Sequence, residues 1–205
     1  MLLAKLTKAH IHIAHVSSEY SLKIIEMGKK EGINITCEAT PHHFSFSDDE
    51  ILKNAYDTNF KMSPPLREIS DVKAVREALK SGLIDVIATD HAPHHTDEKI
   101  VEFDKAPFGI IGLQTLVPLT LKLVNEGVIS LERMVELTST NAAKMLNLKN
   151  KGRLAVGMLA DIAVIDTEIE YVYDEKINRS KSINSPLFGK KLKGAATTTI
   201  KSGKI

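Results

Sequence analysis

The sequence predicts an α/β fold in which parallel strands are joined by helical crossovers, and three observations lead to that class. Residues 1 to about 148 alternate short strand-like runs with segments of helical periodicity. The runs are mostly apolar, as is typical of parallel strands buried on both faces. Strands separated by helices also suit parallel pairing, because parallel neighbours need a crossover connection and not a tight hairpin. We therefore expect a parallel sheet covered by helices.

Capping residues mark the helices that lie between the expected strands. The strands are expected over residues 11–15, 33–39 and 83–89. Ser17 or Ser18 can cap the first helix, which is expected to end at Gly32. Ser70 can cap the second helix, which is expected to end at Gly82. Two further helices are expected over residues 113–125 and 130–146, separated by Gly127 and Ser130.

The C-terminal part of the chain has a different pattern. Residues 160–166 and 197–204 are strand-like, and no helix is expected between them. We place a boundary near residues 149–152. The predicted organisation is therefore a first domain over residues 1–148 and a small β-rich piece over residues 149–205.

Composition excludes several classes of protein. The 205 residues are 43% hydrophobic and 26% charged, which is a normal mixture for a globular protein. The formal net charge of +1 gives no strong attraction to nucleic acid or to membranes, and no apolar run approaches the roughly 20 residues that span a bilayer. The single cysteine, Cys37, permits no internal disulfide and fits a reducing compartment. Because the first residues also do not resemble a signal peptide, a cytoplasmic protein without nucleic-acid or membrane partners is expected.

Polar residues with metal-binding chemistry follow each of the three expected strands. His15 ends the first strand, residues 40–43 (Thr-Pro-His-His) follow the second, and Asp90 follows the third. Functional residues of parallel α/β folds collect at the carboxyl ends of the strands. Imidazole nitrogen and carboxylate oxygen are ligands that catalytic Zn²⁺ uses, and an aspartate can also move protons. Position alone favours structural roles, such as a hydrogen-bonded histidine or a capping aspartate, and Cys37 is expected in the core.

Five motifs narrow this choice because they resemble one family in order and in spacing. The motifs span residues 12–18, 38–43, 61–67, 88–94 and 105–109. Together they closely resemble the type I dihydroorotases of the amidohydrolase superfamily, and residues 152–161 resemble the segment that leaves the barrel in that superfamily. The resemblance implies a (β/α)₈ barrel of the TIM type and a small β-sandwich built from both chain ends. On that template the chain supplies barrel strands six to eight and the C-terminal part of the sandwich.

The resemblance also implies roles for particular residues. His15 matches a metal-binding histidine, and Asp90 matches an aspartate that binds metal and acts as the general acid/base. The substrate-contacting positions are Ser63, His94, Phe108 and Gly109. The family has an asparagine where this chain has Ser63, and a hydroxyl is shorter and offers one donor where an amide offers two.

The implied reaction is the reversible cyclisation of N-carbamoyl-L-aspartate to L-dihydroorotate in pyrimidine biosynthesis, with one or two Zn²⁺ ions in a complete site. A hydantoinase or allantoinase is the alternative within the enzyme class. A non-catalytic partner of aspartate transcarbamoylase is the alternative from another class. The expected partners are the small-molecule substrate and either a second copy of the chain or aspartate transcarbamoylase.

The family template contains further site residues for which this sequence has no counterpart. They are a His-x-His motif with a nearby arginine, a carboxylate of the fourth strand and a histidine of the fifth. His10 and His12 form a His-x-His string, but they lie on the expected sixth strand. Strand alternation predicts His10 and His12 on one face and His15 on the other. We therefore expect an incomplete site that is inactive by itself.

Overall fold

The computed structural model describes residues 1–205, which form two compact units. The first unit comprises residues 1–113 and 180–186, and the second comprises residues 114–179 and 187–205. Each unit is described by itself below. None of the helices has the combination of length and apolar character needed to cross a membrane.

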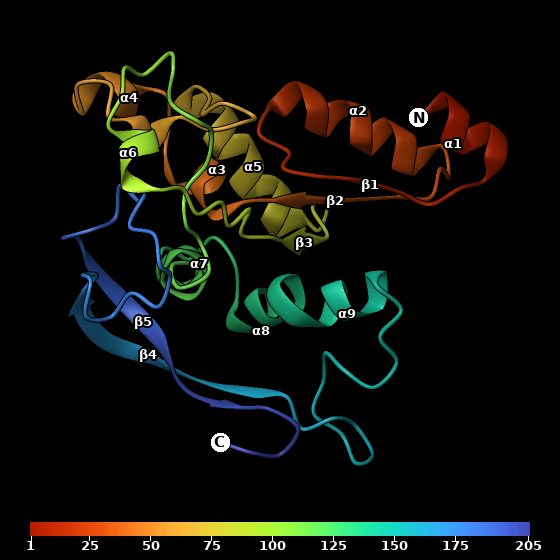
Figure 1. Ribbon diagram of the computed structural model, residues 1–205. Helices are drawn as coiled ribbons and strands as arrows, with labels where there is room; N and C mark the ends of the chain where they lie inside the picture. Colours follow the sequence, from red (N-terminus) through yellow and green to blue (C-terminus); the bar gives the residue numbers. More distant parts are fainter. The chain divides into compact units, whose positions relative to one another are not determined.

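A three-stranded parallel sheet is the centre of the first unit (Figure 1). The strands are β1 (Ile11–Ile13), β2 (Ile35–Ala39) and β3 (Val86–Ile87), in the order β1-β2-β3. In the register, Ile11 pairs with Ile35 and Glu38 pairs with Val86. The predicted parallel α/β arrangement is therefore confirmed for this unit, although the strands are shorter than the expected ranges.

Two amphipathic helices connect these strands and pack on each other. Helix α2 (Glu19–Lys30) begins after Ser18, whose hydroxyl accepts a hydrogen bond from the Ser21 amide at 3.2 Å. Helix α5 (Ile69–Ser81) begins after Glu68, so the expectation that Ser70 caps it is wrong, and it ends as expected at Gly82, which has a left-handed φ of 89°. The faces toward the core carry Leu22 and Ile25 from α2 and Val72, Val75 and Leu79 from α5. Burial of each such side chain stabilises the folded state by about 1.5–3 kcal/mol. This packing fixes the helices against the sheet and thereby holds the strand ends in place.

Short helical segments in the first unit were not expected from the sequence. They are α1 (Leu2–Thr7), α3 (Pro41–Ser45), α4 (Asp49–Lys53), η1 (Thr58–Phe60) and α6 (Thr96–Lys99). Segments of one or two turns carry too few residues to show helical periodicity, so pattern analysis misses them. Helix α3 starts with a proline in its first turn, which suits the proline ring because that amide needs no helical partner.

The helices of the second unit agree with the two that were expected. They are α7 (Leu116–Asn125), followed by α8 (Leu131–Val135), the π-helical segment η2 (Glu136–Thr140) and α9 (Asn141–Met145). The last three segments follow one another without a break, and the Ser130 hydroxyl caps the first of them by accepting from the Arg133 amide at 3.1 Å. Leu121, Leu123 and Leu137 are almost completely buried.

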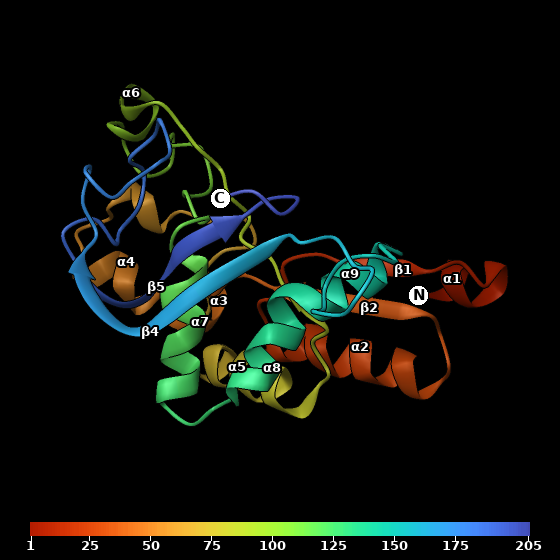
Figure 2. The same cartoon turned by 90° about the horizontal axis from the view of Figure 1, so that it is seen from below.

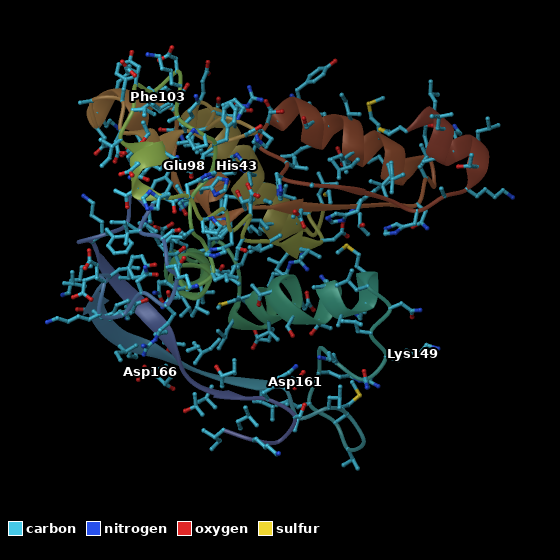
Figure 3. The ribbon with its side chains drawn as sticks, viewed as in Figure 1. His43, Glu98, Phe103, Lys149, Asp161 and Asp166 are labelled. Carbon is cyan, nitrogen blue, oxygen red and sulfur yellow. The ribbon has the colours of Figure 1, made fainter.

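A twisted antiparallel ribbon completes the second unit (Figure 2). It consists of β4 (Ile162–Val172) and β5 (Lys191–Ile200), and β5 packs against α7. Gly194 of β5 has a φ of 89°, and a Cβ at this position would collide with the Leu121 side chain of α7. At the start of the ribbon, Asp161 accepts hydrogen bonds from Lys151 and Lys201, both at 2.7 Å (Figure 3). The ribbon agrees with the predicted strands, but β5 begins six residues earlier than expected, at Lys191 rather than 197.

Candidate functional site

The two predicted metal ligands occupy equivalent positions at the ends of outer strands β1 and β3. His15 lies two residues beyond β1 and Asp90 lies three residues beyond β3. Both residues have a left-handed backbone, with φ angles of 54° and 48°. Non-glycine residues seldom adopt this conformation, and such outliers are concentrated at functional sites. The left-handed turns bring the His15 Nε2 atom to 3.5 Å from the Asp90 Oδ1 atom.

Glu38 of the central strand β2 lies beside two histidines of the β1 segment. Its carboxylate accepts a hydrogen bond from His12 Nε2 at 3.0 Å, and its other oxygen lies 2.9 Å from His15 Nδ1. The His15 Nδ1 atom is buried and makes no hydrogen bond, so the second contact is a close approach without good hydrogen-bond geometry. The Glu38 backbone carbonyl also accepts from the Val16 amide at 2.8 Å, which ties the turn after β1 to β2.

The expectation that His12 and His15 lie on opposite faces is wrong. Strand alternation holds only while the backbone stays extended, and β1 ends at Ile13. The left-handed turn at His15 then directs its side chain toward the same glutamate that His12 contacts. Sequence analysis also did not single out Glu38. The sequence did contain a signal for Glu38. It is a carboxylate within an otherwise apolar run, and a charge on a buried strand requires partners.

His42 and His43 are buried behind this cluster on α3, where Figure 3 labels His43. The His43 Nε2 atom lies 2.9 Å from the Pro64 carbonyl and Nδ1 lies 2.7 Å from the Thr40 hydroxyl. Because a carbonyl only accepts, Nε2 carries the proton and the Thr40 hydroxyl donates to Nδ1. Burial lowers the pKa of His43 to about 4 and holds that of His42 well below its usual range. Both imidazoles are therefore neutral near pH 7.

Cys37 is fully buried in β2, in agreement with the expected core position. Its thiol donates to the Leu83 carbonyl at 3.4 Å. Burial raises the pKa of the thiol to about 11, so the thiolate that nucleophilic attack requires is scarce near neutral pH.

The structure also brings together three of the predicted substrate-contacting residues. The His94 Nε2 atom lies 2.9 Å from the Phe108 carbonyl, and the Gly109 amide donates to the Lys61 carbonyl at 2.8 Å. Gly109 has a φ of 101°, and a Cβ there would lie only 2.6 Å from Ala92 Cβ, so this position favours glycine. Ser63 is exposed two residues after Lys61, and its hydroxyl makes no hydrogen bond to His94 or Phe108.

The donor set of His15 and Asp90 fits two positions of a divalent metal site. Two ligand atoms at about 2.1 Å from one tetrahedral ion lie about 3.4 Å apart. The 3.5 Å between His15 Nε2 and Asp90 Oδ1 agrees with that separation. No group of three or more histidine, cysteine, aspartate or glutamate side chains in the chain is arranged to hold a metal ion. The residues present therefore fit part of a metal site.

Comparison with known proteins identifies the family. The whole chain, residues 1–205, matches the model of the amidohydrolase family. The chain therefore belongs to the amidohydrolase family.

Curated relatives confirm the resemblance that the motifs indicated. A dihydroorotase of Geobacter metallireducens is 51% identical over 203 residues, and one of Geotalea daltonii is 49% identical over 203 residues. Each alignment covers 99% of this chain and 47% of the relative. The chain thus spans about half the length of the curated relatives that it matches.

Solved structures with a similar fold include hydantoinases. The L-hydantoinase (dihydropyrimidinase) from Arthrobacter aurescens has a TM-score of 0.92 and 31% identity, and a D-hydantoinase has a TM-score of 0.89 and 30% identity. Each match covers 99% of this chain and 46% of the solved chain. The fold is thus that of the amidohydrolase family, and sequence identity is higher to the dihydroorotases.

Proposed function

We propose that this chain carries one half of the active site of a dihydroorotase, which interconverts N-carbamoyl-L-aspartate and L-dihydroorotate. In this proposal, residues 1–148 are strands six to eight of a (β/α)₈ barrel with their helices, and residues 149–205 belong to a small β domain. The observation that carries the proposal is the convergence of His15, Glu38 and Asp90 at the carboxyl ends of three adjacent parallel strands. The 51% identity to a dihydroorotase favours dihydroorotate over a hydantoin as the substrate.

Asp90 and His15 have distinct parts in the proposed reaction. Both would hold a divalent cation, for which Zn²⁺ is the proposal, through the Asp90 carboxylate and His15 Nε2. When bound, such an ion supplies a Lewis acid that activates water and polarises the amide carbonyl. Asp90 accepts the proton of the attacking water and delivers it to the ring nitrogen as the amide bond breaks. The same carboxylate thus serves as base and then as acid.

Glu38 supports His15 in this scheme. A buried carboxylate beside Nδ1 favours the tautomer that carries its proton there, which leaves Nε2 with a lone pair toward Asp90. The hydrogen bond from His12 to Glu38 compensates the buried charge of the carboxylate from its other side.

Substrate binding falls to the residues around His94. The imidazole of His94 is proposed to contact the substrate carboxylate, and the backbone of Phe108 and Gly109 to hold the ring. Ser63 is proposed to replace the family asparagine with a single hydroxyl contact. The proposed ligand of this site is thus a small cyclic amide. Assembly with a second copy or with aspartate transcarbamoylase is a separate proposal, which co-purification tests.

A chimera tests the proposed activity. Residues 1–205 replace the matching segment of the Geobacter metallireducens dihydroorotase, which is 51% identical, and the purified chimera is assayed with dihydroorotate, hydantoin and allantoin side by side. We expect turnover of dihydroorotate with a clear preference over the other two rings. A folded chimera that prefers hydantoin, or that turns over none of the three, would contradict the proposal. Circular dichroism of the chimera and of the parent enzyme establishes folding.

A further inference from the structure

Asn184 lies far from the site residues in the sequence, yet its side chain bridges two of their loops within the first unit. The segment Ser180–Pro186 belongs to that unit, and Asn184 is 4% exposed. Its Nδ2 atom donates to the Ala92 carbonyl at 2.9 Å and to the Gly109 carbonyl at 3.3 Å. Its Oδ1 atom accepts from the His94 amide at 3.2 Å. The amide group therefore uses both of its donors and its acceptor.

The chemistry of these partners fixes the orientation of the Asn184 amide. Two of the partners are carbonyls, which only accept, and the third is a backbone amide, which only donates. A flipped side chain would place Nδ2 against the His94 amide and Oδ1 against two carbonyls. Asn184 also holds the loop through its own backbone, since its carbonyl accepts from the Ile111 amide at 3.1 Å. The bridge thus joins residues 92–94 to residues 109–111 through four hydrogen bonds.

Lys99 anchors the same turn from another direction. Its buried ammonium donates to the Pro107 carbonyl at 2.9 Å and to the Gly109 carbonyl at 3.2 Å. His94 Nε2 contacts the Phe108 carbonyl at 2.9 Å, and His94 Nδ1 lies 3.4 Å from Glu98, which Figure 3 labels. The Gly109 carbonyl consequently receives donors from both Lys99 and Asn184. Asn184 and Lys99 thus hold the backbone of His94 and of the two residues that flank Phe108, which are Pro107 and Gly109.

We propose that Asn184 is a positioning residue that sets the spacing between His94 and the Phe108–Gly109 turn, and thereby the affinity for a cyclic amide that carries a carboxylate. This rests on the proposed function for its substrate. Asn184 is too buried to contact substrate itself, so it acts through the backbone of its two partner loops. Displacements of about 1 Å at such loops can cost up to about 10²-fold in rate or binding.

Two variants separate the parts of the bridge. Asn184→Leu is similar in size and removes all three side-chain hydrogen bonds. Asn184→Asp keeps the acceptor for the His94 amide, but it loses both donors and places a carboxylate against the Ala92 and Gly109 carbonyls. Asn34→Leu is the matched control, because Asn34 is exposed in the same unit and only its backbone carbonyl makes a hydrogen bond.

Hydrogen exchange gives a readout that does not need activity. In the chimera described above, Asn184→Leu is expected to accelerate exchange in the peptide that contains His94 by at least about tenfold, while exchange in β2 stays as in the parent. Asn184→Asp is expected to leave the His94 amide protected. Unchanged exchange at His94 in Asn184→Leu, or equal acceleration throughout the unit, would overturn the positioning role.

Kinetics then test the consequence for substrate. Both Asn184 variants are expected to raise KM for dihydroorotate by about tenfold to 10²-fold, with kcat within about threefold of the parent, and Asn34→Leu is expected to change neither. A KM that stays unchanged despite faster exchange at His94 overturns the proposal. If the parent chimera turns over no cyclic amide, the proposed function fails, and the exchange result alone then decides whether Asn184 positions the two loops.

Discussion

His15 and Asp90 each combine a functional side chain with a backbone conformation that costs free energy. A left-handed φ in a non-glycine residue costs about 1–3 kcal/mol, and aspartate tolerates it better than most residues. Both residues of the proposed pair of metal ligands have this strained backbone. An extended backbone at His15 would place its side chain on the other face of the strand from His12. The strain therefore has a consequence, which is the shared contact of His12 and His15 with Glu38.

The first residue-scale prediction concerns the proton shuttle at Asp90. In the chimera, Asp90→Asn is expected to lower kcat by about 10²–10⁴-fold. The asparagine amide cannot accept the proton, and general acid/base groups accelerate reactions by this factor. Folding should persist, since asparagine also tolerates a left-handed φ of 48°. Steady-state kinetics and a thermal melt measure the two effects. A variant that keeps a tenth of the parent activity would remove Asp90 from the proposed role.

The second residue-scale prediction concerns acid stability and His43. Burial lowers the pKa of His43 from an ordinary value of 6.5 to about 4, so the folded chain binds fewer protons than the unfolded chain between these pH values. Stability is therefore retained above pH 6.5 and is lost as the pH falls toward 4. The free energy of unfolding should drop by up to roughly 3 kcal/mol over this window. Urea titrations of the chimera at several pH values measure it.

A matched pair of variants isolates the contribution of His43. His43→Gln removes one of the two buried histidines with a lowered pKa and should reduce the pH dependence between pH 6.5 and 4, while His42 still contributes to it. His10→Gln replaces an exposed histidine and should leave the dependence as it is. Equal pH dependence in the parent and in His43→Gln would show that another group causes the loss.

At the scale of elements, the sequence was most informative where periodicity and capping agreed. The helix over residues 19–30 was predicted from a serine cap and a glycine end, and its structure has Ser18 as the cap. The three parallel strands were predicted from apolar runs, because burial on both faces selects such residues. The same patterns also placed His15 and Asp90 at strand ends, which is where the structure has them.

Other features of the site had no local signal. No residue pattern indicates the left-handed turns at His15 and Asp90, and alternation alone placed His15 on the wrong face. Asn184 is an ordinary polar residue in a segment without periodicity, and its partners lie about 75–92 positions earlier in the chain. Pairings over such distances are decided by the packing of the whole unit, so one sequence does not reveal them.

An element-scale prediction concerns the contact between β5 and α7. Gly194→Ala is expected to lower the free energy of unfolding of the second unit by about 2–4 kcal/mol. Part of this is backbone strain at a φ of 89°, and part is overpacking against Leu121, which is 1% exposed and has little room to move. Chemical denaturation followed by circular dichroism measures the loss.

Gly189→Ala is the control for the strain component. Gly189 has a similar φ of 75°, but a Cβ there would meet nothing within 4 Å. Its cost should be about 1 kcal/mol, the lower end for backbone strain. Equal losses in the two variants would mean that the Leu121 contact contributes nothing.

At the scale of the whole molecule, the chain has a parallel sheet with two outer strands and a group of exposed apolar side chains. The parallel sheet has β1 and β3 as its outer strands, and three leucines of α1 (Leu2, Leu3 and Leu6) are each at least 76% exposed. Open strand edges and clustered apolar side chains are sites of association between chains. The relatives that the chain matches are about twice its length, and the proposed metal site has two ligands where catalytic zinc sites usually have three.

The last prediction is that the 205-residue chain, expressed alone, self-associates and turns over no dihydroorotate. Its sheet has too few strands to close a barrel, which takes about eight with matched tilt and stagger. Adding the N-terminal half of the Geobacter metallireducens relative should reduce self-association and produce activity, because that half would cover the open edge and supply the remaining ligands. Size-exclusion chromatography with light scattering, run beside the activity assay, measures both. Leu3→Lys with Leu6→Lys should reduce association without producing activity. A monodisperse, cooperatively melting monomer that turns over dihydroorotate unaided would contradict both the strand count and the proposed incompleteness of the site.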